Sequence, residues 1–153
     1  MYRTIVARKT RRVFDALNRA DAGVLVAGLA RQPQHVMDGA HCLAGARHRQ
    51  ESIEQWYARL FRLLPDLRFD VDEVVVAGPP WRTVVAVQWR DHALSGRYSN
   101  RGVNIIRLRW GRVESVDIYC DTELMARTLD DLARRGTAEA AAAPITDTPV
   151  TAR

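Results

Sequence analysis

The apolar residues of the chain recur with two different periods, and the change from one to the other divides the sequence. Between Ile53 and Leu64 they recur every three or four residues and form one continuous face, as in an amphipathic helix. Pro65 ends this helix, because its ring has no N–H to donate and clashes with a helical predecessor. The same spacing predicts an earlier, interrupted helical region over residues 5–29.

Beyond Pro65 apolar and polar residues alternate, which is typical of half-buried strands. The predicted strands are residues 67–77, 83–92, 103–110 and 113–120. Their connections contain Gly and Pro and leave no room for crossover helices, so the strands form an antiparallel meander. A short extended segment at His35–Asp38 precedes them, and a final helix runs from Thr122 to about Arg135. We therefore predict an α+β fold, a curved antiparallel sheet with N-terminal helices and a C-terminal helix against one face.

The length of 153 residues, of which 47% are hydrophobic, suits one globular domain with its own core. We assign residues 1–136 to this domain. Residues 137–153 are rich in Ala, Thr and Pro, and we interpret them as a tail that is ordered only by docking.

The tight turn expected at Gly111-Arg112 assigns the faces of the last two strands. An Arg109–Glu114 pair suits the exposed face, which turns Leu108 and Trp110 toward the helices. In this register several polar residues also point inward: Asn104, Ser115, Asp117, Tyr119 and Asp121. Buried polar groups need partners, so a pocket between the sheet and the helices is expected. A shift of one residue would reverse this assignment.

The charge balance is basic, with a formal net charge of +5. Part of the excess lies in the first predicted helix, in Arg3, Arg8, Lys9, Arg11, Arg12 and Arg19. Such a run is usually the solvated face of a helix. Nucleic-acid binding through these arginines is a third, disfavoured hypothesis, since no zinc-finger or RNA-binding signature accompanies them.

The apolar stretches, cysteines and histidines of the sequence indicate where the protein is located and whether it binds a metal. The longest apolar stretch, Ala22–Ala30, is about half of a membrane span, and no secretory signal is visible, so we expect a cytoplasmic protein without a membrane partner. Cys42 and Cys120 are expected to be reduced. The spacing of His35, His41, Cys42 and His48 fits no standard zinc site, and we predict no metal and no cofactor.

Three stretches resemble one known superfamily, and the likeness covers about residues 3–135. They are Asp38-Gly39-Ala40-His41 through Gly45, Ser52 through Tyr57, and Gly111-Arg112-Val113-Glu114 running into Tyr119-Cys120-Asp121-Thr122. The chain is similar to nuclear-transport-factor-like proteins, ketosteroid-isomerase-like enzymes and SnoaL-like polyketide cyclases. The resemblance implies a cone-shaped fold with an internal cavity. It also implies a homodimer that pairs through the convex sheet face.

The resemblance also implies site residues. An acid/base group near the end of the last strand corresponds to Asp121, and a base after the first helical region is closest to Asp38, with His35 or His41 as alternatives. The position of the acid that helps form the oxyanion hole of ketosteroid isomerases corresponds to Asn104 or Ile106, so that constellation is not reproduced.

The candidate catalytic residues are thus Asp121, Asp38 and His41, and each has a structural alternative. Asp121 also suits the N-cap of the last helix, and Asp38 and His41 also suit an exposed loop. The candidate substrate-binding residues are Trp56, Tyr57, Trp89, Asn104 and Tyr119. For the aromatic residues of the second helix, packing in the core is the alternative.

Two functions remain open. The first is a SnoaL-like enzyme that uses cofactor-free acid/base chemistry to isomerise, cyclise or hydrate a small hydrophobic carbonyl compound. The second is a non-catalytic ligand-binding or dimerisation module of the same fold.

Overall fold

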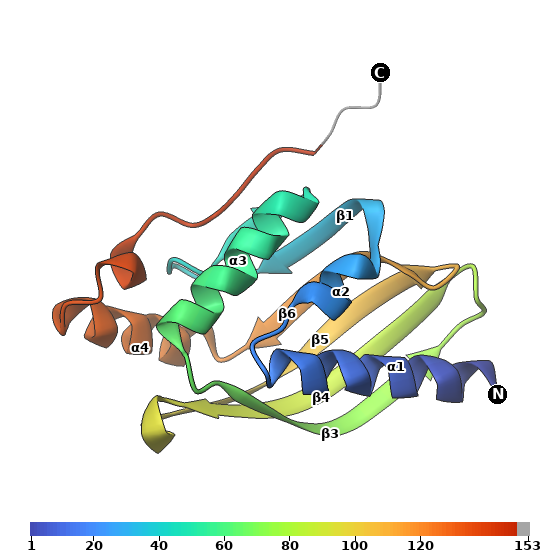
Figure 1. The fold of residues 1–153 in the computed structure, drawn as a ribbon, viewed down its shortest axis with the longest axis horizontal. Coiled ribbons are helices and arrows are strands. Elements are labelled where there is room, and N and C mark those ends of the chain that lie inside the picture. The colour runs from blue at the N-terminus through green and yellow to red at the C-terminus, as the bar shows by residue number, and fades with distance from the viewer. Residues whose placement is uncertain (150–153) are drawn as a thin grey trace.

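The computed structural model describes residues 1–149 (Figure 1). Its elements in chain order are α1 (Tyr2–Leu17), α2 (Gly23–Ala27), β1 (Leu29–Met37), β2 (Gly45–Arg47), α3 (Gln50–Leu63), β3 (Arg68–Ala77), β4 (Thr83–Ala93), β5 (Tyr98–Arg109), β6 (Arg112–Cys120) and α4 (Thr122–Arg134). Short 3₁₀ turns lie at Leu94–Gly96 and Ala138–Ala141. The predicted α+β class is confirmed, and no helix within residues 1–149 combines the length and apolar character needed to cross a membrane.

The six strands form one sheet in the order β2-β1-β6-β5-β4-β3. The predicted meander corresponds to β3 to β6, in which every neighbouring pair is antiparallel. The extended segment predicted at His35–Asp38 is part of a longer strand, β1, which pairs in parallel with β6 and antiparallel with β2. These long-range pairings enlarge the sheet from four strands to six.

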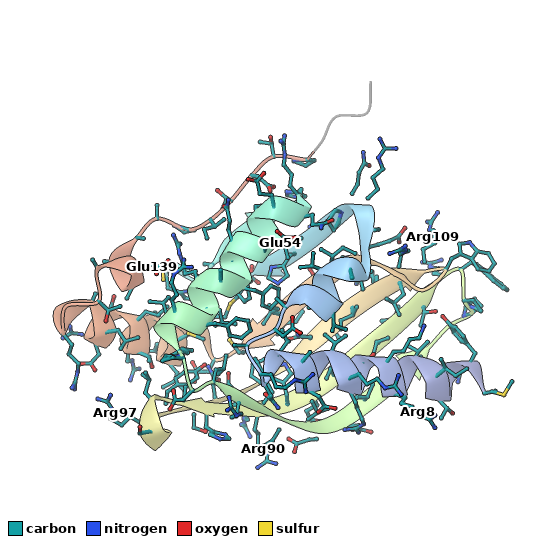
Figure 2. All side chains as sticks on the ribbon, viewed as in Figure 1. Arg8, Glu54, Arg90, Arg97, Arg109 and Glu139 are labelled. Carbon is teal, nitrogen blue, oxygen red and sulfur yellow. The ribbon has the colours of Figure 1, made fainter. Side chains whose placement is uncertain are left out.

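The helices cover one face of the curved sheet, and the core lies between the two layers (Figure 1). The apolar face predicted on the second helix is confirmed, because Ile53, Trp56 and Leu60 on α3 are buried. The end of α1 is tied to β3 through Asn18, whose side chain both donates to the carbonyl of Phe69 (3.0 Å) and accepts from its N–H (2.7 Å). Charged side chains such as Arg8, Arg90 and Arg97 project outward (Figure 2).

The register predicted for the last hairpin is wrong, by two residues next to the turn and by one residue beyond the bulge that follows it. The turn consists of Trp110 and Gly111, both with positive φ, and Arg109 pairs with Arg112. A bulge follows at Glu114, so that Ile118, not Tyr119, lies opposite Asn104. On β5 the inward face of Asn104, Ile106 and Leu108 is as expected. Trp110 instead lies at an exposed turn, with 69% of its surface accessible.

On β6 the bulge turns two of the predicted inward residues, Asp117 and Tyr119, to the outer face. Tyr119 is 49% exposed, and Asp117 accepts a hydrogen bond from Arg107 at 2.7 Å on the outer face. The predicted outward Arg109–Glu114 pair is present as an ion pair at 3.0 Å. Val116 and Ile118 take the inward positions and are buried.

The C-terminal segment, as far as residue 149, packs along α3. Glu139 forms ion pairs with Arg59 and Arg62. Further along, the carboxylate of Asp147 accepts hydrogen bonds from the N–H of His48 at 2.6 Å and from the hydroxyl of Ser52. The last four residues of the predicted tail, 150–153, lie outside the described residues.

Candidate functional site

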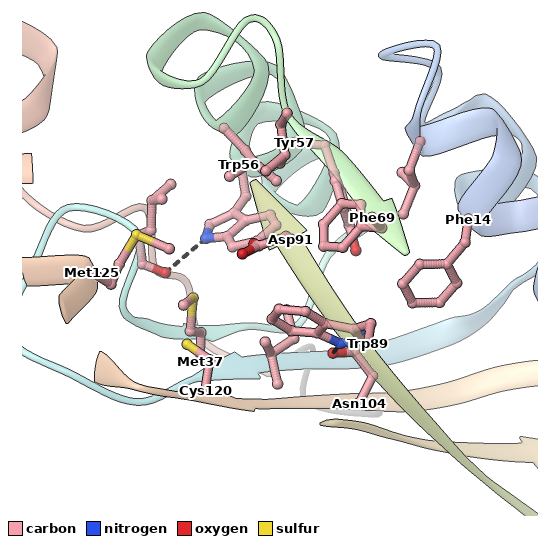
Figure 3. Close-up of a pocket in the computed structure, with 15 residues that line it drawn as sticks. Phe14, Met37, Trp56, Tyr57, Phe69, Trp89, Asp91, Asn104, Cys120 and Met125 are labelled. Carbon is pink, nitrogen blue, oxygen red and sulfur yellow. Dashed lines mark hydrogen bonds between the residues drawn. The ribbon is translucent and has the colours of Figure 1, made fainter. Parts of the chain in front are cut away.

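A cavity lies between the sheet and the helices α1, α3 and α4 (Figure 3). Most of its wall is apolar and comes from every layer of the fold: Phe14, Leu17, Met37, Leu43, Trp56, Leu60, Leu67, Phe69, Trp89, Ile118 and Met125. The remaining lining residues are Tyr57, Asp91, Asn104 and Cys120. The cavity volume is about 40 Å³, which is room for about three water molecules. It is therefore a small apolar chamber with a few polar groups.

Asp91 is the carboxyl group of this cavity. It continues the inward series of β4, in which Val85, Val87 and Trp89 precede it at every second position. Only 4% of its surface is exposed. One carboxylate oxygen accepts from the N–H of Asn100 at 3.0 Å, and the other from the hydroxyl of Tyr98 at 3.4 Å.

Burial raises the pKa of Asp91 to about 6, because the charged carboxylate loses hydration in this apolar wall. The hydrogen bonds from Asn100 and Tyr98 oppose this rise by stabilising the charged form. The pKa of the neighbouring Cys120 thiol is also raised by burial, to about 11, so the thiol is neutral at pH 7. A carboxyl group with a pKa near neutrality can both accept and return a proton.

Asn104 presents an amide group to the cavity from β5. The indole N–H of Trp89 donates to its Oδ1 at 2.9 Å. Because an indole nitrogen is only a donor, this bond fixes the amide orientation and makes the Nδ2 group the free donor. Among the described residues, Nδ2 has no acceptor within hydrogen-bonding distance. Asn104 can therefore donate a hydrogen bond to an oxygen inside the cavity.

Tyr57 contributes a second hydrogen-bonding group, a hydroxyl, from α3. The residue is 3% exposed, and its oxygen lies 3.3 Å from Nε2 of His35. Burial holds the pKa of the phenol well above its ordinary value. Tyr57 is therefore a neutral phenol that lines the same cavity as Asp91 and Asn104.

The predicted substrate-binding residues separate into two groups. Trp56, Tyr57, Trp89 and Asn104 all line the cavity, whereas Tyr119 lies on the outer face of the sheet. For Trp56, both readings hold in part: it is buried core, with its indole N–H bonded to the carbonyl of Leu43 at 2.8 Å, and it also forms cavity wall (Figure 3).

The three predicted catalytic residues do not line the cavity. Asp121 is exposed and caps α4, since its Oδ1 accepts from the N–H of Leu124 at 3.0 Å. Asp38 is exposed in the loop after β1. The Nδ1 of His41 accepts from the N–H of Leu43 at 3.2 Å, and burial lowers the pKa of this histidine. The alternative residue, His35, is buried beside Tyr57.

Sequence reasoning missed Asp91, although one signal pointed to it. The alternation that places Val85, Val87 and Trp89 on one face of β4 extends to Asp91 two residues later. Asp91 provides a carboxyl group for proton transfer, and Asn104 and Tyr57 provide two hydrogen-bond donors for an oxygen atom. The arrangement is suited to acid/base chemistry on an oxygen-containing apolar molecule.

Solved structures of other proteins have a similar fold. The chain has a TM-score of 0.65 and 25% identity with an NTF2-like protein of unknown function from Burkholderia pseudomallei, covering 79% of this chain and 94% of that one. A protein assigned as a SnoaL-like polyketide cyclase from Jannaschia sp. is 20% identical, with a TM-score of 0.64 over 82% of this chain and 92% of its own.

A third structure, TerC co-crystallised with polyporic acid, is 16% identical, with a TM-score of 0.64 over 80% of this chain and 96% of its own. No curated protein matches the sequence. Residues 10–116 match the SnoaL-like domain, which is more than half of the chain. The sequence match and the cone-shaped architecture of these structures agree, and the chain belongs to the SnoaL-like family.

Proposed function

We propose that this protein is an enzyme that moves a proton on a small hydrophobic carbonyl compound held in the cavity. The observation that carries this proposal is the buried carboxyl group of Asp91, which lines an apolar cavity and has a pKa raised to about 6. Asp91 takes the place that the sequence had suggested for Asp121, because Asp121 is exposed and caps a helix.

In the proposed reaction the Asp91 carboxylate removes a proton from a carbon next to the substrate carbonyl. The electron pair of that C–H bond moves into the carbonyl and leaves an enolate, whose oxygen accepts hydrogen bonds from Tyr57 and Asn104. Asp91, now protonated, returns the proton to another carbon of a substrate that carries a conjugated double bond. Alternatively, the enolate carbon attacks a second carbonyl of the same substrate to close a ring, and Asp91 gives its proton to the alkoxide that forms. No external oxidant or reductant is needed, because electrons are only redistributed within the substrate.

The cavity is too small to hold a ring-sized substrate unless side chains of its wall move. Its volume of about 40 Å³ is smaller than the roughly 150 Å³ of an apolar cavity that holds benzene. Met37 and Met125 form part of the wall, and unbranched methionine side chains change rotamer readily. In this proposal a ring-sized substrate enters when these two side chains move aside.

The proposal is tested with cyclopentanone, a small ketone with exchangeable protons beside its carbonyl. We expect the protein to accelerate exchange of these protons for deuterium in D₂O, measured by ¹H NMR against buffer alone. D91N removes the base and should lower the rate on the order of 10²–10⁴-fold, the usual contribution of general acid/base catalysis. D121N is the matched control, since it makes the same chemical change at an exposed cap that asparagine also supports.

A non-catalytic ligand-binding function is the second candidate, and the small, largely apolar chamber favours it. It predicts that cyclopentanone binds without any acceleration of exchange. Equal rates for the wild-type protein and D91N would contradict the enzymatic proposal.

A further inference from the structure

Arg47 is the most deeply buried charged residue of the described chain. It lies on β2, opposite His35 of β1, and has no exposed surface. Its guanidinium donates to the carbonyls of Ala44, Gly45 and Ile145, and its Nε donates to Nδ1 of His35 at 3.1 Å. Within residues 1–149 no carboxylate forms an ion pair with it. Burial lowers its pKa to about 10, so it remains charged at pH 7.

This arginine fixes the direction of a chain of hydrogen bonds. Because a guanidinium can only donate, Nδ1 of His35 must be the acceptor. Burial and the nearby charge of Arg47 hold the pKa of His35 well below its ordinary value, so the ring is neutral and its proton lies on Nε2. The 3.3 Å contact between Nε2 and Tyr57 is therefore a donation from histidine to the phenol oxygen.

The consequence concerns the proton of the Tyr57 hydroxyl. Since the tyrosine oxygen accepts from His35, its own proton is available to another acceptor, and none of residues 1–149 provides one. Tyr57 lines the cavity. The chain from Arg47 through His35 thus leaves the hydroxyl as a hydrogen-bond donor and places a buried positive charge behind it.

We propose that Arg47 and His35 are positioning residues that keep Tyr57 a hydrogen-bond donor to the substrate oxygen. This inference rests on the proposed function and specifies it: the favoured ligand carries a carbonyl oxygen that gains negative charge during reaction. Such a donor contributes most when charge develops on the oxygen, because it is already oriented and shielded from water.

Two further contacts hold this chain in place. The ring of Trp56 packs against both members, with its centroid 4.6 Å from that of His35 and 5.3 Å from the guanidinium carbon of Arg47. From the C-terminal segment, the carbonyl of Ile145 accepts from Arg47 at 2.8 Å, and Asp147 anchors the segment to His48 and Ser52. Docking of this segment therefore completes the surroundings of Arg47.

A purely structural role does not require this arrangement. A structural role would require only that the carbonyls of Ala44, Gly45 and Ile145 keep a donor, not that His35 hold its proton on Nε2. R47M fills the same space without a donor, and R47K restores a donor-only cation. Comparing R47M with R47K therefore distinguishes an effect of side-chain packing from an effect of the hydrogen bond that Arg47 donates to His35.

The first measurement uses ¹⁵N NMR of the histidine rings, with H35Q to assign the signals and circular dichroism to verify folding. We expect His35 to carry its proton on Nε2 in the wild-type protein and in R47K. In R47M, Nδ1 is free to take the proton, and a second tautomer should appear. A wild-type His35 with its proton on Nδ1 would overturn the proposal.

The second measurement is the ¹³C chemical shift of carbonyl-labelled cyclopentanone bound to the protein, which moves downfield when strong donors contact the oxygen. We expect this displacement to shrink in R47M and in Y57F and to recover in R47K. An unchanged shift in R47M, or no bound ketone in the wild-type protein, would contradict the inference.

The same samples separate the two proposals. If D91N leaves proton exchange unchanged while the carbonyl shift responds to R47M, the enzymatic proposal fails and the donor chain stands. If exchange depends on Asp91 but neither the tautomer of His35 nor the carbonyl shift responds to R47M, the donor chain fails and the enzymatic proposal stands. For R47M we expect an exchange rate about 10-fold lower, less than the roughly 10²-fold loss that removal of a donor to an oxyanion causes.

Discussion

Asp91 and Asp121 both lie near the ends of strands, but the fold gives their carboxyl groups opposite surroundings. Asp91 is 4% exposed in the cavity wall, whereas Asp121 is exposed and caps α4. Asn100 lies between them: its N–H donates to the Asp91 carboxylate, and its side chain bonds both the carbonyl (3.0 Å) and the N–H (3.2 Å) of Asp121. Two aspartates that share one neighbour therefore have different chemistry.

The difference shows that burial, not closeness to a strand end, determines what these two carboxyl groups can do. Burial raises the pKa of Asp91 to about 6, since the charged form loses its hydration. Asp121 keeps its contact with water and uses its oxygen to satisfy the first turn of a helix. The surroundings of Asp91 suit the proton-transfer role that we propose, and those of Asp121 give it a structural role.

The pH dependence of proton exchange should give the largest contrast between the two residues. If the Asp91 carboxylate is the base, the value of kcat/KM falls about 10-fold per pH unit below its pKa of about 6. The loss reaches about 100-fold at pH 4. D121N should show the same profile as the wild-type protein. A rate that does not change between pH 4 and pH 7 would contradict ionisation of Asp91 as the catalytic step.

D91N should also change stability, in the direction opposite to its effect on activity. The pKa of Asp91 is about 6 in the folded protein and 3.8 as the ordinary value, so ionisation disfavours the folded state as pH rises. The free energy of unfolding is thereby lowered by about 3 kcal/mol at pH 8, and this cost vanishes below pH 4. We expect D91N to be more stable than the wild-type protein at pH 8 by up to this amount.

Urea unfolding of both proteins at pH 8 and pH 4 measures this difference. The quantity to compare is the variant minus the wild type, because other groups titrate in both proteins alike. A D91N protein that is less stable at pH 8 would show that the carboxylate is stabilised by its hydrogen bonds more than burial disfavours it.

A smaller effect is expected at Asp121. D121A removes the oxygen that accepts from Leu124, and loss of an N-cap costs about 1 kcal/mol of stability. D121N keeps a capping oxygen and should remain within about 0.5 kcal/mol of the wild-type protein. Urea unfolding of the two variants at pH 7 measures the difference, and equal stabilities would argue against the capping role.

Much of the fold could be predicted from the sequence because it depends on local periods. The helical face around Trp56 and the alternation of β3 and β4 are visible in the order of the residues, and Pro65 marks the boundary between them. The helical period also placed Tyr57 on the cavity side, and Asn104 was expected there too, although the hairpin register used to place it was wrong.

The rest of the site depends on pairings that local patterns do not determine. A tryptophan with positive φ at the last turn and a bulge at Glu114 shift the register of β6, and neither has a clear sequence signal. The contact between His35 and Arg47 requires β1 to pair with β2, across a loop that shows no periodicity. Asp91, by contrast, could have been found by extending the alternation of β4 to its end.

The smallest expected effect is at Tyr119, and it tests the register directly. In the observed register Tyr119 is 49% exposed on the outer face, opposite Val103, while its neighbour Ile118 is 8% exposed and points into the core. We expect Y119A to change the free energy of unfolding by no more than about 0.5 kcal/mol, as at other surface positions. I118A serves as the matched control and should cost about 2–5 kcal/mol, because it leaves a cavity beside buried neighbours. Urea unfolding measures both, and proton exchange on cyclopentanone should be unchanged in Y119A. A large loss of stability or exchange in Y119A, with little in I118A, would mean that the hairpin has the opposite register and that its tyrosine belongs to the cavity.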